Sequence, residues 1–265
     1  MRHRVELGTK VRLDDIDASD TGGYADRAAA AVELARDVAR LDELQDRLYA
    51  ENTRSLLVVL QAMDSGGKDG TIKHVMSGVN PIGCQVTSFK SPSEEEADHD
   101  FLWRIGKALP RRGNIGIFNR SHYEDVLVVR VHDLVPPSVW RERFDQINRF
   151  ERLVSELGTR VLKFYLHIDR DEQKRRLQAR LDDPNKTWKF SPADLAERQR
   201  WNDYREAYDD VLTKCSTEWA PWFVVPANKK WYRNLVVART IVKTLEEMDP
   251  RPPRPTVDPK KIVID

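Results

Sequence analysis

A short, mostly apolar run, "SLLVVL" at 55–60, is followed directly by the glycine-rich stretch "QAMDSGGKDG" at 61–70. A continuous apolar run of this length is typical of a strand that is buried on both faces of a sheet. The next residues, "DGTIKHVMSGV", favour a helix that ends near residues 78–81. A glycine-rich turn between a strand and a helix presents backbone N–H groups at the positive end of that helix, where phosphate binds. The order of strand, loop and helix therefore predicts a phosphate-binding α/β domain.

Further strands and helices alternate along the rest of the chain. Strand candidates lie at 84–89, 114–119, 159–169 and 222–227, and helical patterns lie at 28–50, 91–110, 136–158 and 232–248. Such alternation predicts a parallel, doubly wound sheet with helices on both faces, which is a three-layer αβα architecture with five strands. In such sheets, ligands bind at the carboxyl ends of the strands.

One connection is too long for a simple crossover. Residues 170–219 are strongly charged and helical, and "DDPNKTWKFSP" interrupts them, so we interpret them as a helical lid. We expect an N-terminal arm at 1–27, a single domain at 28–248 and a proline-rich tail at 249–265.

Composition narrows the choice of partners and compartment. The formal net charge of the 265 residues is +1, so charge gives no overall case for nucleic acid or an anionic membrane as a partner. The start of the chain lacks the apolar stretch of a signal peptide, and no run approaches the ~18 apolar residues of a membrane span. Cys84 and Cys215 form neither a CxxC nor a metal pattern. We therefore expect a cytoplasmic protein without a membrane span.

The loop departs from the usual nucleotide-binding pattern at two positions. Ala62 stands where the first glycine is usual, and Asp69 stands where a Ser or Thr normally follows the lysine. Lys68 would reach the bound phosphates as a positive charge. Asp64 would hold Mg²⁺, with Mn²⁺ as an alternative, or would bond to the loop backbone instead. Asp69 would either approach the metal or complement the helix dipole.

The third strand candidate is followed by "FNRSHYEDVL". Asn119 ends this strand, at a position where an acid often helps to hold Mg²⁺ in related phosphoryl-transfer proteins. The guanidinium of Arg120 would clamp a phosphate, or would form a surface ion pair with Glu124 or Asp125. Tyr123 would line the cleft or serve packing.

A basic cluster lies within the expected lid. It is either a solvated helical face or a set of cations opposite the phosphate loop, with the Asp-Pro step at 183–184 turning Arg180 and Lys186 inward. Lys73 and Lys90 would add positive charge beside the same cleft. A single small nucleotide does not need so many cations, whereas a long polyanion does.

Three segments together resemble polyphosphate kinase family 2. They are "AMDSGGKDGTIKHVMSGVNP", "FNRSHYEDVLVVRVH" and "RLDDPNKTWKFSPADL", and the resemblance extends over about residues 30–245. It implies a P-loop kinase fold with a helical lid, Mg²⁺ as cofactor, and phosphoryl transfer between inorganic polyphosphate and a nucleotide. It also implies a homo-oligomer, either a dimer or a tetramer.

The resemblance assigns roles to four residues. Asp64 looks like the loop aspartate that works with Mg²⁺, and Lys68 looks like the loop lysine. Arg120 resembles the arginine after the third strand, and Arg180 resembles the lid arginine that closes on the transferring group. Our expected phosphate-binding set is Gly66, Gly67, Lys68, Asp69, Gly70, Thr71, Lys73, Lys90, Arg120, Tyr123 and Lys186. Our expected nucleotide-binding set is Asp69, Arg120, Glu124 and Lys186.

Two positions differ from many members of the family. Asn119 replaces a metal-binding aspartate, which leaves Asp64 as the main metal ligand, and Glu124 replaces an asparagine. The stretch "FNRSHYED" is similar to the subclass that accepts both AMP and ADP, with guanine nucleotides as further candidates. The sequence thus predicts a polyphosphate-dependent kinase that converts AMP or ADP to ADP or ATP. The alternatives are an ATP-dependent nucleoside monophosphate kinase and a non-catalytic nucleotide-binding module.

Overall fold

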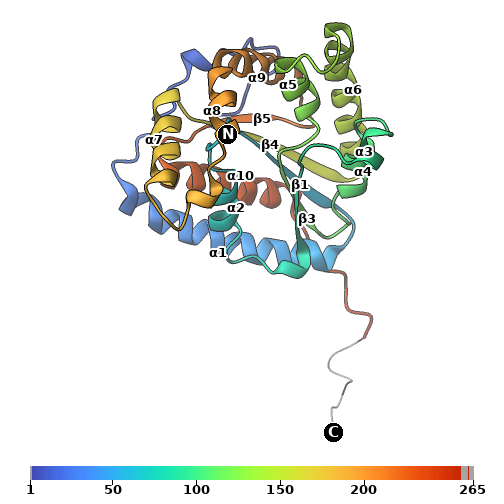
Figure 1. The fold of residues 1–265 in the computed structure, drawn as a ribbon. Helices are drawn as coiled ribbons and strands as arrows, with labels where there is room; N and C mark the ends of the chain where they lie inside the picture. Colours follow the sequence, from blue (N-terminus) through green and yellow to red (C-terminus); the bar gives the residue numbers. More distant parts are fainter. Residues whose placement is uncertain (1, 258–261, 263–265) are drawn as a thin grey trace.

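The structure, a computed structural model, describes residues 2–257 and 262. Its centre is a parallel five-stranded sheet in the order β2-β3-β1-β4-β5 (Figure 1). The strands are β1 (Ser55–Gln61), β2 (Cys84–Ser88), β3 (Ile115–Asn119), β4 (Thr159–His167) and β5 (Trp222–Pro226). All five predicted strands and their parallel pairing are confirmed.

Helices cover both faces of this sheet (Figure 1). One layer contains α1 (Arg27–Glu51), α2 (Lys68–Val75) and α10 (Lys230–Met248), and the other contains α5 (Glu124–Val131), α6 (Pro137–Glu156) and α9 (Trp201–Cys215). Successive side chains of β1 pack into the hydrophobic cores on opposite faces of the sheet, with Leu56 and Val58 in one core and Leu57 and Val59 in the other. Burial of each such side chain contributes roughly 1.5–3 kcal/mol. The three-layer αβα architecture is confirmed.

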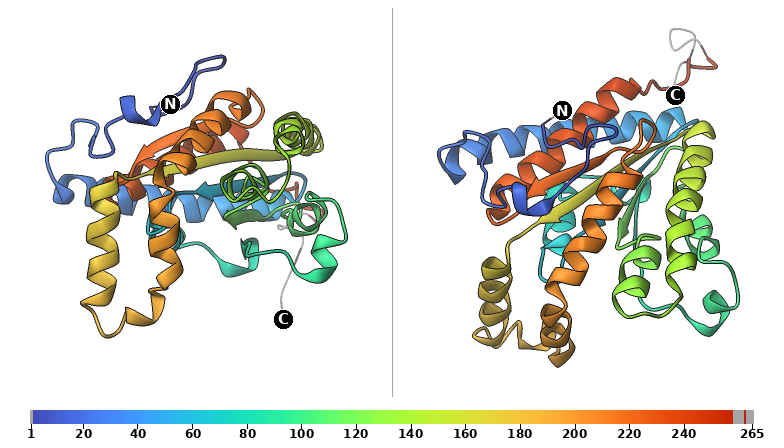
Figure 2. Two further views of the ribbon diagram at one scale, coloured as in Figure 1. Left: turned by 45° about the horizontal axis from the view of Figure 1, so that its top comes forward. Right: turned by 90° about the horizontal axis from the view of Figure 1, so that it is seen from above.

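The lid projects from the body as a helical hairpin (Figure 2). It consists of α7 (Arg170–Leu181), the short η3 (Thr187–Lys189) and α8 (Pro192–Gln199). Asp169 caps α7 through the backbone N–H of Glu172, and Ser191 with Asp194 forms a capping box on α8. The expected lid at 170–219 therefore includes more than the hairpin, because α9 packs into the core of the body.

The region between β2 and β3 corrects one prediction. The single helix expected at 91–110 is two short helices, α3 (Glu94–Ala97) and α4 (Trp103–Ala108). Ser93 and Glu96 form the capping box that the sequence suggested. The break follows from local polar bonding, because the Asp100 carboxylate accepts from the backbone N–H of Leu102 at 3.0 Å and starts a new turn.

The N-terminal residues lie against the edge of β5. Arg4 forms an antiparallel bridge with Phe223, and the side chains of Val5, Val11, Leu13 and Ala18 are buried. Short 3₁₀ turns occur at η1 (Leu13–Asp15) and at η2 (Pro81–Gly83), just before β2. The expected tail contains neither helix nor strand at residues 249–257 and 262, and its other positions lie outside the described residues. No helix within the described part of the chain has the length and hydropathy needed to cross a bilayer.

Candidate active site

Two glycines shape the loop between β1 and α2. Gly67 is the N-cap of α2 and has a φ of 100°, in the left-handed region that favours glycine. A Cβ atom at Gly67 would lie 2.0 Å from Nη1 of Arg233, and one at Gly66 would lie 2.4 Å from the Cβ of Ala62. The close packing of the loop therefore requires glycine at both positions. The first turn of α2 consequently opens onto the cleft, as in phosphate-binding loops.

Lys68 begins α2 and lines the cleft. Its Nζ donates to the carbonyl oxygen of Ala62 at 3.2 Å, and the side chain is half-buried. Burial, followed by the nearby charge of Arg120, lowers the pKa of Lys68 below its ordinary value. Two cations close together in a partly desolvated site favour the binding of an anion between them.

Arg120 directly follows β3 and adopts a strained backbone conformation. Its φ is 64°, which is rare for a residue other than glycine, and its backbone N–H donates to Leu60 at 3.1 Å. The Arg120 guanidinium lies 3.3 Å from the carboxylate of Asp64. The structure therefore brings together the loop aspartate and the strand-end arginine that were expected in one site.

Asp69 also pairs with a strand-end residue. The side-chain amide of Asn119 donates to its carboxylate at 2.8 Å. Asp64 and Asp69 both line the cleft, while the described residues contain no cluster of three or more His, Cys, Asp or Glu able to hold a metal alone. Mg²⁺ commonly takes one or two carboxylates together with substrate phosphates, so this donor set fits a phosphate-bridged Mg²⁺.

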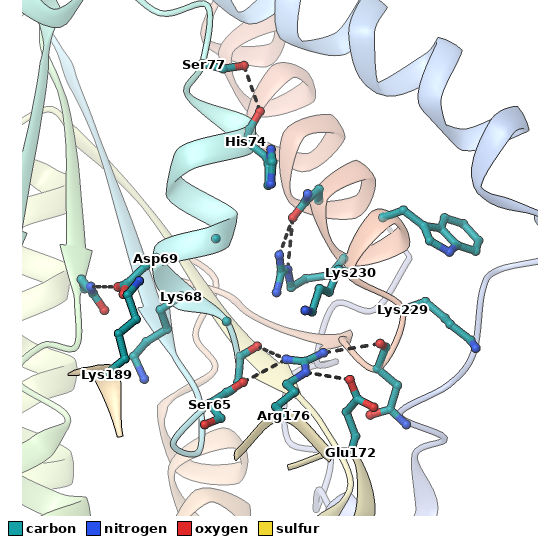
Figure 3. Close-up of a pocket in the computed structure, with 18 of the residues that line it drawn as sticks. Ser65, Lys68, Asp69, His74, Ser77, Glu172, Arg176, Lys189, Lys229 and Lys230 are labelled. Atoms are coloured by element: carbon teal, nitrogen blue, oxygen red, sulfur yellow. Dashed lines mark hydrogen bonds and ion pairs between the residues drawn. The ribbon is translucent and has the colours of Figure 1, made fainter. Parts of the chain in front are cut away.

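The first lid helix is bonded to the phosphate loop. Arg176 donates to the carbonyl oxygens of Ser65 at 3.0 Å and Gly66 at 2.9 Å, and to the carboxylate of Glu172 at 2.7 Å (Figure 3). Gln173 donates to the carbonyl of Asp64 at 3.0 Å. These bonds direct the loop carbonyls toward α7, so that they do not compete with an anion for the loop N–H groups.

Arg233 is a buried cation that lacks a carboxylate partner. Only 2% of its surface is exposed, and its guanidinium bonds to the side-chain oxygen of Asn234 at 2.8 and 3.1 Å. No carboxylate of the described residues lies within 4.0 Å of it. Burial, and then the charge of Arg176, lowers the pKa of Arg233 to about 9. A buried, unpaired guanidinium is costly, and an anion in the cleft would offset that cost.

The lid places further cations over the cleft. Arg180 is half-buried and lies 3.5 Å from the carboxylate of Asp194 on α8. Lys186 lines the cleft but is exposed and paired with Asp183. Lys90, which follows β2, also lines the cleft.

Positive charge is concentrated in this cleft. In the part of the chain that the structure describes, the cleft measures about 1740 Å³, and its walls carry twelve Lys and Arg residues against four carboxylates. The cations are Arg27, Lys68, Lys90, Arg120, Arg175, Arg176, Arg180, Lys186, Lys189, Lys229, Lys230 and Arg233. Figure 3 shows Lys68 of α2, Lys189 of the lid and Lys230 of α10 among the residues that line this cleft. Since the whole chain has a formal charge of only +1, this asymmetry is local.

Three predicted contacts need correction. Tyr123 is fully buried and bonds to Glu151, so its hydroxyl faces the core and not the cleft. Thr71 is 1% exposed and donates to the carbonyl of Gly67 inside α2. Lys73 is exposed and does not line the cleft. Burial removes Tyr123 and Thr71 from the site, and Lys73 lies outside the cleft lining. Glu124 is half-buried behind the cleft wall, with its charge close enough to Lys68 and Arg120 to act on the pKa of both, so its assignment to the nucleotide stays a prediction.

The remaining predicted residues do line the cleft. They are Asp64, Gly66, Gly67, Lys68, Asp69, Gly70, Lys90, Arg120, Arg180 and Lys186. Sequence reasoning gave no individual role to Arg176 and missed Arg233. The signal was the position of "ANKKWYRN" directly after the fifth strand, since the carboxyl ends of parallel strands meet at one edge.

Comparison with known proteins agrees with this geometry. Residues 24–253 match the family model described as Polyphosphate kinase 2. The chain belongs to the polyphosphate kinase 2 family. It is 51% identical over 265 residues to an AMP/ADP-polyphosphate phosphotransferase of Meiothermus ruber, covering 100% of this chain and 99% of that protein.

Two further members of the family are similar over most of the chain. An ADP-polyphosphate phosphotransferase of Rhodopseudomonas palustris is 46% identical over 257 residues, covering 92% of this chain and 89% of that protein. The crystal structure of polyphosphate kinase 2 from Arthrobacter aurescens TC1 superposes with a TM-score of 0.92 at 46% identity, covering 96% of this chain and 92% of that one. The polyphosphate kinase 2 fold thus extends over nearly the whole chain.

Proposed function

We propose that this protein transfers a phosphoryl group reversibly from inorganic polyphosphate to AMP, ADP or both, giving ADP and ATP. The observation that carries the proposal is the cleft itself, in which, among the described residues, twelve cations face four carboxylates and the buried Arg233 has no carboxylate partner. Each unit of a polyphosphate chain brings its own negative charge, so this donor matches an extended cationic cleft better than a single nucleotide does. The names of the similar phosphotransferases support both the donor and the acceptors.

The reaction needs positioning and charge stabilisation more than proton transfer. An ionised oxygen on the terminal phosphate of AMP or ADP attacks the terminal phosphorus of polyphosphate. The bridging P–O bond then breaks, and polyphosphate leaves one unit shorter. Lys68, Arg120 and Arg180 stabilise the charge on the transferring group in a loose transition state. Because the nucleophile is already ionised, no general base is required.

Asp64 is the main candidate for holding Mg²⁺, with Asp69 beside it and Mn²⁺ as an alternative ion. When bound, the ion neutralises phosphate charge and orients the reacting groups. We assign the acceptor nucleotide to the side of the cleft near Arg120 and Asp69. Guanine nucleotides are further candidate acceptors. The proposal includes a homo-oligomer in the cytoplasm.

A luminescent ATP assay tests the function. AMP and ADP are supplied separately, each with Mg²⁺ and with or without long-chain polyphosphate. We expect ATP from ADP in one step and from AMP after a lag, and no ATP when polyphosphate is omitted. Conversion of AMP to ADP driven by ATP alone, with no response to polyphosphate, would instead establish a nucleoside monophosphate kinase.

A further inference from the structure

A cluster of buried charged and polar groups lies outside the cleft, beneath the loop that carries Arg120. Lys163 of β4 donates to the hydroxyl of Tyr123 at 2.8 Å, to the carbonyl of Cys215 at 2.7 Å, and to the carboxylate of Glu151 on α6. The other oxygen of Glu151 accepts from the Tyr123 hydroxyl at 2.9 Å and lies 3.1 Å from the His122 ring. None of these four side chains is more than 2% exposed.

Stability alone does not account for this cluster. Removing a lysine and a glutamate from water costs several kcal/mol per ion, and well-packed apolar residues of similar volume often serve equally well or better. Val161 and Tyr165, the neighbours of Lys163 on the same face of β4, pack in the apolar core. Burial alone would raise the pKa of Glu151, but Lys163 and His122 outweigh burial and hold it below its ordinary value. Both carboxylate oxygens of Glu151 accept hydrogen bonds inside the cluster.

The cluster forms hydrogen bonds to His122 and Tyr123, which lie two and three residues after Arg120. Arg120 has a φ of 64°, and such strain persists only where the surrounding structure enforces it. On the side toward β1, Gln61 donates to the Ser121 hydroxyl at 3.2 Å, and that hydroxyl also accepts from the backbone of Tyr123 at 3.2 Å. On the side toward α6, the carboxylate of Glu151 forms hydrogen bonds with the side chains of both His122 and Tyr123.

We propose that Glu151 is a positioning residue for catalysis: through His122 and Tyr123 it fixes the strained turn that aims the Arg120 guanidinium at the transferring phosphate. This inference rests on the proposed role of Arg120. Lys163 neutralises the charge of Glu151 and links the turn to β4 and to the end of α9. The cluster thus connects the turn that carries Arg120 to β4 in the sheet.

A double-mutant cycle tests the proposal. Glu151→Gln keeps the volume of the side chain but cannot accept from His122, Tyr123 and Lys163 together. We expect it to lower kcat for ADP about 10- to 100-fold in the folded protein, with little change in KM, because small misplacements of catalytic groups have effects of this size. In an Arg120→Ala background, the same substitution should change the residual kcat by less than about twofold. The effects of the two substitutions would then not be additive, as expected when Glu151 acts through Arg120.

Asp37→Asn is the matched control. Asp37 is another buried carboxylate, 6% exposed, and it pairs with Arg239 between α1 and α10, outside the cleft. The Asp37→Asn variant should have a lower melting temperature than the parent protein and an unchanged kcat. Should Glu151→Gln fail to fold, Tyr123→Phe removes a single hydroxyl of the cluster and is tested in the same cycle.

The outcomes separate positioning from mere stability. Equal fold-losses of kcat with and without Arg120, or a loss of thermal stability with unchanged kcat, would overturn the proposal. The cycle compares ratios of rates and is run with whichever phosphoryl donor the parent protein uses. A failure of polyphosphate as the donor would therefore contradict the proposed function without affecting the test of Glu151.

Discussion

Replacing Lys68 by alanine is expected to reduce ATP formation from ADP and polyphosphate about 10²- to 10³-fold, a loss of ~3–4 kcal/mol of transition-state stabilisation. Lys68 begins α2 at the glycine loop and lies close enough to Arg120 for that charge to lower its pKa. In the transition state both cations face charge spread over the transferring oxygens. Removal of one cation leaves that charge poorly compensated in a partly desolvated site.

The measurement is kcat and KM for both substrates, together with a thermal unfolding curve. Lys73→Ala is the matched control, because Lys73 lies on the same helix but is exposed and outside the cleft. It should keep the parental rate within about twofold, as is usual for surface substitutions away from a site. Comparable activity in the Lys68 and Lys73 variants would remove Lys68 from the mechanism.

Replacing Arg180 by alanine is expected to lower kcat by about 10²-fold while KM for ADP changes much less. Arg180 lies 3.5 Å from the carboxylate of Asp194 within the lid hairpin. Closure of the lid onto the substrates would bring its guanidinium to the transferring phosphate. A contact made mainly in the transition state affects turnover more than ground-state binding.

Steady-state kinetics separate the two effects. Lys174→Ala changes an exposed cation on the same helix that does not line the cleft, so both of its constants should match the parent. A rise in KM for Arg180→Ala with an unchanged kcat would recast the lid arginine as a binding residue only.

The sequence predicted β1, β3 and β5 well because they are short and largely apolar runs. These strands are buried between helical layers, and that burial leaves a direct trace in composition, whereas β2 is partly exposed and largely polar. The loop and the first turn of α2 were predicted equally well, since Gly66, Gly67 and Lys68 are local in the chain. The expected helix at 91–110 failed because Asp100 offers the backbone a polar partner that ends one helix and starts another.

It was harder to predict from the sequence which way the side chains of the site point in the folded protein. Tyr123 lies three residues after Arg120, yet it turns into the core because its hydroxyl finds Glu151 from α6. Arg233 is 165 residues from Lys68 in the numbering of the chain, and only the fold places it against Gly67. Neither placement follows from spacing, since both depend on how distant helices pack on the sheet.

A crystal structure with a linear polyphosphate of defined length is the most direct test of the cationic cleft as a polyphosphate site. We expect one end of the chain at the glycine loop, in contact with Lys68 and Arg233, and its successive units along the cleft beneath Arg180. A chain bound on another face of the molecule, with these three side chains free of phosphate, would contradict the account.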